Sequence, residues 1–137
     1  MKIKLERWAY MPIRAHEDDA GLDLRSPQTI LIRSGSSVKI DTGVHVELPR
    51  YTVGFLKSKS GLNVKHGIQS GEGVIDVGYT GSIAVKLYNH SNKDYQVMRG
   101  DKISQLVILP ILTPDLEVVD ELEETERGSG GFGSTGR

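Results

Sequence analysis

Short segments in which apolar and polar residues alternate make up most of the chain, and Gly, Pro, Asn, Asp and Ser separate them. Between residues 81 and 89, Ile83, Val85 and Leu87 share one side of an extended chain, whereas Lys86 and Tyr88 point to the other. This period of two predicts a strand with one buried face. The same pattern predicts strands over residues 29–32, 37–41, 44–48, 52–56 and 102–109. Many short strands at this spacing indicate an all-β domain built as a sandwich, a jelly roll or a closed barrel.

One segment, residues 61–66, favours a helix. Ser60 suits the N-cap position before it, and Gly67 suits the left-handed position after it. The start of this helix lies beside Lys59, so free backbone amides, a helix dipole, a cation and a hydroxyl converge, as a phosphate site requires. An ordinary strand-to-helix turn also uses Ser and Gly, so this segment alone leaves both interpretations open.

The end of the chain divides into an acidic segment and a glycine-rich tail. Residues 115–126 carry seven carboxylates, and the apolar residues among them are predicted to form a last strand on the core or on a neighbouring subunit. The apolar residues are Leu116, Val118, Val119 and Leu122. We expect residues 1–125 to form the β domain and residues 126–137 to form a flexible lid, because glycine loses much backbone entropy on ordering.

Residues 128–133 formally match the dinucleotide-binding pattern G-x-G-x-x-G. That motif needs a strand before it, a helix after it and an acidic residue about 20 positions on, whereas only four residues follow here. A disordered tail or a leftover of an expression vector is the simpler alternative. The position of Arg127 ahead of free backbone amides, with Ser134 and Thr135 as further donors, favours a lid that binds an anion.

Composition narrows the classes of function. The 137 residues have a net charge of −1 and are 37% hydrophobic, which predicts one soluble globular domain without the basic excess of a nucleic-acid-binding protein. The longest apolar run, residues 106–112, is too short to span a membrane, and the charged N-terminus does not fit a signal peptide. Cysteine is absent, which excludes disulfides and thiolate chemistry and fits a cytoplasmic location. The four histidines lie too far apart to suggest a local metal site.

Four further motifs precede the tail, and each one alone reads as an ordinary turn. They are residues 20–24 (AGLDL), 59–62 (KSGL), 73–81 (GVIDVGYTG) and 100–106 (GDKISQL). Together with the tail, in this order and spacing, they resemble the five motifs of the trimeric dUTP pyrophosphatases (dUTPases). The resemblance runs from about residue 15 to residue 136. It implies a distorted jelly-roll or barrel fold with one short helix, assembled as a homotrimer with sites at subunit interfaces.

The resemblance also implies the reaction, the hydrolysis of dUTP to dUMP and pyrophosphate by attack of water on the α-phosphorus. Asp76 matches the carboxylate that activates this water and meets the sugar 3′-hydroxyl. Tyr79 matches the ring that packs on the deoxyribose and leaves no room for a 2′-hydroxyl. Glycines around this motif fit a tight hairpin, in which the backbone near Gly73 and Ile75 reads the edge of uracil.

The same resemblance assigns the phosphate and metal groups. Asp23 and Gln105 match residues that act on Mg²⁺ through metal-bound water, and Gln105 also matches a substrate contact; scattered oxygen donors suit this ion. Ser60 and Gly61 match residues that contact the phosphates. Here the usual Pro-Arg-Ser-Gly is replaced by Ser-Lys-Ser-Gly, and Lys59 keeps the charge but loses the planar fork of arginine.

In the tail, Arg127 matches the residue that clamps the γ-phosphate, and Phe132 matches the ring that covers uracil. Gly133, Ser134 and Thr135 match further substrate contacts. The resemblance implies that the tail of one subunit closes a site built by the other two.

Two alternatives stay open. The related dCTP deaminases share the β fold and a similar Asp-x-Gly-aromatic turn, but they use a catalytic glutamate in a context that has no match here, and they lack the glycine-rich ending. A regulatory protein binder gated by the nucleotide is the second, since some phage-borne dUTPases bind partner proteins. No insertion between the motifs offers an obvious surface for such a partner.

Overall fold

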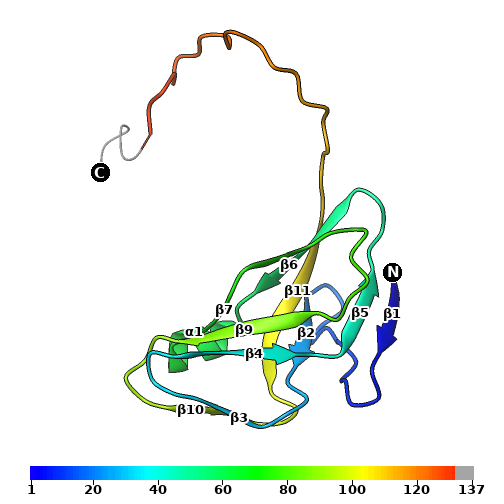
Figure 1. Cartoon of the computed structure of the whole chain (residues 1–137), viewed down its shortest axis with the longest axis vertical. Helices are drawn as coiled ribbons and strands as arrows, with labels where there is room; N and C mark the ends of the chain where they lie inside the picture. The colour runs from blue at the N-terminus through cyan, green and yellow to red at the C-terminus, as the bar shows by residue number, and fades with distance from the viewer. Residues whose placement is uncertain (132–137) are drawn as a thin grey trace.

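A computed structural model describes residues 1–131, and all of its regular elements except one short helix are β-strands (Figure 1). In chain order the elements are β1 (Lys2–Leu5), β2 (Gly21–Arg25), β3 (Ile30–Ile32), β4 (Ser37–Asp41), β5 (Val44–Glu47), β6 (Thr52–Lys57), α1 (Ser60–His66), β7 (Ile68–Ser70), β8 (Gly73–Ile75), β9 (Ala84–Asn89), β10 (Tyr95–Val97) and β11 (Lys102–Pro110). The prediction of an all-β fold with one short helix is confirmed. Among residues 1–131, no helix is long and apolar enough to cross a membrane.

The strands of this part of the chain form four antiparallel sheets. The largest has the order β2-β11-β6-β8, a second has the order β4-β9-β7, and β1-β5 and β10-β3 are two-stranded. Strands that pair are mostly distant in the chain, as β2 is from β11 and β4 is from β9. Pairing of this kind is typical of jelly rolls rather than of a simple succession of hairpins.

The predicted inward face of β9 is confirmed, because Ile83, Val85 and Leu87 are fully buried. Leu24 of β2 and Leu106 of β11 meet this face in the same core. The strand starts at Ala84 rather than at residue 81, since the preceding residues form turns and irregular backbone. Five further strands, β1, β2, β7, β8 and β10, were not predicted, because they are short or interrupt the alternation with glycine or charge.

The predicted helix forms, with a boundary that differs by one residue. Lys59 occupies the N-cap position in extended conformation, and Ser60 is the first helical residue, so the assignment of Ser60 as the N-cap is wrong. Gly67 does adopt the left-handed conformation, with φ of 66°, and its amide donates to the carbonyl of Asn63.

The glycine-rich segment that carries Asp76 and Tyr79 does not fold as the predicted tight hairpin. Its strand β8 pairs with β6, and a turn follows in which the Tyr79 amide donates to the Asp76 carbonyl over 3.0 Å. The chain then passes into β9, which belongs to another sheet. Residues 76–83 therefore lie between two sheets and belong to no strand.

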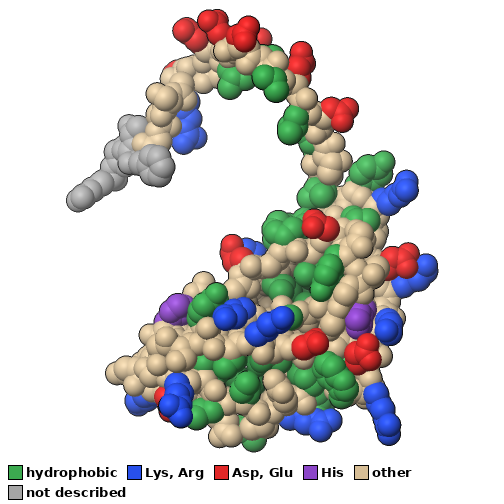
Figure 2. Space-filling view, in the orientation of Figure 1, with side chains coloured by type: hydrophobic (Ala, Val, Ile, Leu, Met, Phe, Trp, Pro, Cys, Tyr) green, Lys and Arg blue, Asp and Glu red, His purple; other side chains and the backbone are tan. Residues whose placement is uncertain are grey.

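Beyond β11 the chain leaves the body of the domain as an arm, residues 112–131 (Figure 1). Leu112, Leu116 and Val118 are more than 90% exposed, so the acidic segment forms no strand on the core of its own chain. Carboxylates follow one another along the outside of this arm (Figure 2). Docking of the segment on a neighbouring subunit stays a prediction.

We expect Leu106→Ala to lower the free energy of unfolding by about 2–5 kcal/mol, because Leu106 is fully buried on the central strand β11. Leu31→Ala is the matched control, since Leu31 is 49% exposed on β3 and should cost roughly 1 kcal/mol or less. Urea unfolding of both variants at one protein concentration measures the difference. Equal losses would show that the core is not where the structure places it.

Candidate functional site

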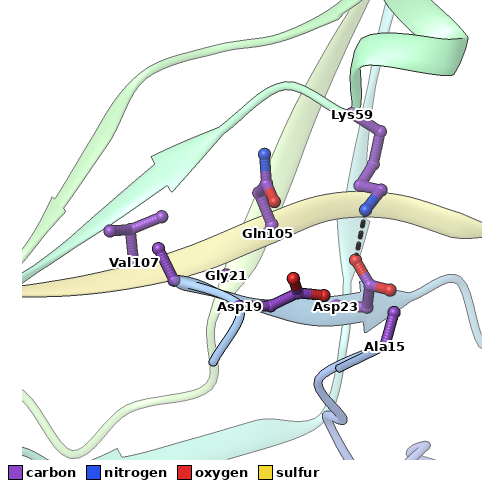
Figure 3. A pocket seen from close by; sticks show the side chains of 8 residues that line it. Ala15, Asp19, Gly21, Asp23, Lys59, Gln105 and Val107 are labelled. Carbon is purple, nitrogen blue, oxygen red and sulfur yellow. Dashed lines mark hydrogen bonds and ion pairs between the residues drawn. The ribbon is translucent and has the colours of Figure 1, made fainter. Parts of the chain in front are cut away.

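Three of the sequence-predicted residues line one cavity of about 290 Å³ at the edge of the largest sheet. Asp23 lies on β2, Gln105 lies on β11, and Lys59 is the residue before α1. The register of the sheet explains their proximity, because Gln105 lies directly opposite Asp23. Their side chains lie around the same space, and that of Lys59 reaches down to Asp23 (Figure 3).

Asp23 is the most constrained group of this cavity. It is 1% exposed, and its two carboxylate oxygens accept from Lys59 Nζ over 2.5 Å and from Lys102 Nζ over 2.7 Å. Burial alone raises the pKa of a carboxyl group, but the hydrogen bonds and charges of Lys102 and Lys59 outweigh burial here and lower the pKa of Asp23. Its ionised form therefore stabilises the fold above the ordinary value of 3.8, and this contribution is lost as the pH falls through the lowered pKa.

Gln105 is held by its amide nitrogen, which donates to the Ser58 carbonyl over 3.1 Å. The amide oxygen lies over Gly21, where a Cβ atom would collide with the Gln105 side chain. Gly21 in the AGLDL motif thus provides the space that Gln105 occupies. This arrangement leaves the amide oxygen as an acceptor beside Asp23.

The start of α1 borders the same cavity through Lys59. No side chain caps the first turn of the helix, and that turn contains no acidic residue. A Cβ atom at Gly61 would meet nothing within 4 Å, so packing within the chain does not explain this glycine. The open space beside Ser60 and Gly61 is suited to close approach of a ligand to the backbone.

A second group of predicted residues surrounds the turn after β8. Asp76 is exposed, and Tyr79 is 45% exposed. The Tyr79 hydroxyl donates to the Ser82 carbonyl over 2.9 Å, and its ring lies so close to Gly81 that a Cβ atom there would be 2.6 Å from the ring. Gly81 therefore leaves room for the hydroxyl end of the ring to lie against the backbone.

The two groups lie on opposite edges of one sheet. Asp23 is on the edge strand β2, whereas Asp76 follows the other edge strand, β8, and two strands separate them. At the usual strand spacing the two edges are about 14 Å apart. Asp76 and Tyr79 do not line the cavity of Asp23, so the described part of a single chain holds two partial sites.

Arg127 belongs to the arm, residues 112–131, which leaves the body of the domain (Figure 1). Its Nε donates to the carbonyl of Gly130, three residues further along. The other predicted tail residues, Phe132, Gly133, Ser134 and Thr135, lie outside the described residues.

Sequence reasoning missed two charged residues of this region. Lys102 pairs with Asp23, and Asp19 lines the cavity with a second carboxylate. Both had a signal in the sequence: Lys102 stands in the GDKISQL motif, and Asp19 ends an acidic run immediately before AGLDL. The pairing itself depends on the antiparallel register of β2 and β11, which the sequence does not display.

The donors around the cavity are carboxylate and amide oxygens, which match the preference of Mg²⁺ for hard oxygen ligands. Lysines already occupy both Asp23 oxygens. Residues 1–131 contain no cluster of three or more His, Cys, Asp or Glu side chains suited to enclosing a metal. The donor set therefore fits an ion that keeps its own water and phosphate ligands better than an ion enclosed by protein.

Comparison with known proteins agrees with the motifs. A family model described as dUTPase matches residues 7–136. A deoxyuridine 5′-triphosphate nucleotidohydrolase of Gloeothece citriformis is 45% identical over 135 residues, which cover 97% of this chain and 93% of that protein.

Solved structures agree as well. A dUTPase variant of Staphylococcus bacteriophage 80alpha with dUpNHpp superposes with a TM-score of 0.93 at 33% identity, covering 99% of this chain and 98% of that one. A dUTPase variant from phage phi11 of S. aureus, with a structural Mg(II) ion, gives a TM-score of 0.84 at 32% identity, covering 90% and 98%. Motifs, fold and near-complete coverage lead to one conclusion: this chain belongs to the dUTPase family.

Proposed function

We propose that this protein hydrolyses dUTP to dUMP and pyrophosphate, by attack of water on the α-phosphorus. This activity limits the incorporation of uracil into DNA and supplies dUMP for the synthesis of dTMP. The observation that carries the proposal is the turn after β8, where an exposed carboxylate, Asp76, lies three residues before a ring whose hydroxyl end packs against Gly81. Family membership supports the assignment.

Asp76 acts as the general base in this proposal. It is exposed and follows directly on the edge strand β8, so a water molecule and a ligand both reach it. A carboxylate within hydrogen-bond distance of the attacking water accepts its proton. The same group accepts a hydrogen bond from the sugar 3′-hydroxyl, and the Tyr79 ring excludes a 2′-hydroxyl.

In this proposal the backbone of β8 recognises the uracil ring. This strand pairs with β6 on one side only, and its other edge has no strand partner among the described residues. An unpaired strand edge presents free amides and carbonyls. Around Gly73 and Ile75 these groups match the donors and acceptors of uracil, whereas cytosine leaves them unpaired.

The phosphates bind at the other partial site. One N–H group of the Lys59 ammonium donates a hydrogen bond to Asp23, and the other two N–H groups remain available at the cavity. Ser60 and Gly61 offer the uncapped first turn of α1. Asp23 and Gln105 hold water of a Mg²⁺ ion, which neutralises the triphosphate charge when it is bound.

A homotrimer unites these partial sites. Val74 on β8 and Leu109 on β11 are 61% and 45% exposed, and the arm adds Leu112, Leu116 and Leu122, each at least 87% exposed. A single chain leaves this apolar surface in water, whereas neighbouring subunits would cover it. Arg127, Phe132, Gly133, Ser134 and Thr135 then close over a site on other subunits and exclude bulk water.

The reaction and its specificity are tested by pyrophosphate release from dUTP, dCTP, dTTP and UTP in the presence of Mg²⁺. We expect turnover of dUTP alone at an appreciable rate. Asp76→Asn should reduce that turnover by about 10²–10⁴-fold, because an amide cannot accept the proton of water. Unchanged turnover in this variant would exclude Asp76 as the base, and ammonia release from dCTP would indicate a deaminase instead.

Removal of all residues after Glu126 should leave the fold and the trimer mass intact but reduce turnover by about 10²-fold, because the closed site is no longer completed. Light scattering measures the mass, and pyrophosphate release measures the turnover. Arg50→Ala, an exposed arginine of the domain body, controls for the loss of a positive charge. A full rate in the truncated protein contradicts the lid, and a monomeric mass of the intact protein contradicts the trimer.

Lys59→Arg should lower the KM for dUTP by roughly two- to fivefold, because a guanidinium fork binds phosphate with two parallel hydrogen bonds. Lys65→Arg is the matched control at an exposed position of the same helix. Steady-state kinetics with both variants separates this local effect from a general change in charge. A rise in KM for Lys59→Arg would show that the Asp23 contact favours lysine.

A further inference from the structure

The imidazole of His45 connects two segments that are distant in the chain. Its Nδ1 lies 2.8 Å from the Thr80 carbonyl oxygen, and its Nε2 lies 3.1 Å from Glu6 Oε1. The ring is 17% exposed and projects from β5, whereas Glu6 follows β1, the partner strand of β5. Its environment therefore consists of one backbone carbonyl and one carboxylate.

Both of these partners only accept hydrogen bonds. The bond to Thr80 therefore needs a ring hydrogen on Nδ1, and the bond to Glu6 needs one on Nε2. Other charges nearby are Lys4, whose Nζ is 3.4 Å from Glu6 Oε1, and Asp41, at the end of β4.

Thr80 directly follows Tyr79, in a segment that no strand pairing holds in place. On the far side of Gly81 this segment is fixed by Asp41, which accepts from the Ser82 hydroxyl, and by Ile83, whose amide donates to the Val44 carbonyl and whose carbonyl accepts from the Thr42 amide. On the Tyr79 side, the Tyr79 amide donates to the Asp76 carbonyl and the Tyr79 hydroxyl donates to the Ser82 carbonyl, and His45 adds a side-chain contact from another strand. The ring of Tyr79 can exclude a hydroxyl only if the backbone beneath it stays in place.

We infer that His45, oriented by Glu6, is a positioning residue that holds Thr80 and thereby sets the discrimination between 2′-deoxyribose and ribose. This inference rests on the proposed function, in which Tyr79 lies against the sugar. His45 touches neither water nor phosphate in this proposal. Its loss should therefore affect the choice of sugar more than the chemical step.

Two substitutions of His45 separate its two hydrogen bonds. The side-chain nitrogen of asparagine can take the place of Nδ1 and still donate to Thr80, whereas that of glutamine takes the place of Nε2 and reaches only Glu6. Both replace the ring by a neutral amide of similar polarity. His45→Asn is thus the rescue variant, and His45→Gln is the loss variant.

The experiment compares kcat/KM for dUTP and UTP in the wild type and both variants, with thermal unfolding to show comparable stability. We expect His45→Gln to reduce the dUTP/UTP ratio by roughly three- to tenfold, mainly through a lower KM for UTP, because one hydrogen bond to Thr80 is lost. His45→Asn should retain the ratio. Glu6→Gln, at a side chain that is 40% exposed, should reduce it by a smaller factor.

Equal ratios in the wild type and in His45→Gln, or equal reductions in both His45 variants, would overturn the inference while dUTP hydrolysis itself stands. Absence of dUTP hydrolysis in the wild type would overturn the proposed function and this inference together. The wild-type measurement therefore separates the two failures.

Discussion

The pairing of β11 with both β2 and β6 is the constraint on which the site depends. Leu106 points inward between Leu22 and Leu56, which fixes the register of all three strands by burial. Because side chains alternate along a strand, the next residue, Gln105, must point outward and lie opposite Asp23. A slip of one residue would expose Leu106 and bury Gln105, so the packing of the core also fixes the polar cavity.

Asp23 lies buried in this sheet, where a carboxylate loses its hydration, and two lysines compensate for that loss. An isolated charge loses most of its hydration on burial, whereas the two ammonium groups at 2.5 and 2.7 Å replace it with charge-assisted bonds. Lys59 and Lys102 come from different elements, so the carboxylate also ties the start of α1 to β11. The same ammonium groups lie where an anionic ligand would arrive.

The alternation of side chains was sufficient to predict the strands that contribute one whole face to the core, such as β4 and β9. It failed for β2, where Leu22 and Leu24 supply only two inward apolar positions and Asp23 is buried on the other face, and for three-residue strands such as β7, whose pairing is decided by distant partners. The family resemblance assigned Asp23 and Gln105 to the metal and Lys59 to the phosphates, and the structure brings these three residues around one cavity. Lys102 and His45 were missed, because their contacts depend on strand register and on loop positions that no local pattern encodes.

The separation of the two partial sites follows from the same sheet. The residues proposed to bind the phosphates lie at the β2 edge and those proposed to bind the nucleoside lie at the β8 edge, and no movement of side chains covers two intervening strands. A triphosphate and its nucleoside are contiguous in one ligand, so one chain cannot contact both ends through these residues. The proposed trimer would account for this geometry by bringing the β8 edge of one chain to the β2 edge of another. Neighbouring subunits would then cover the exposed apolar residues on β8, β11 and the arm.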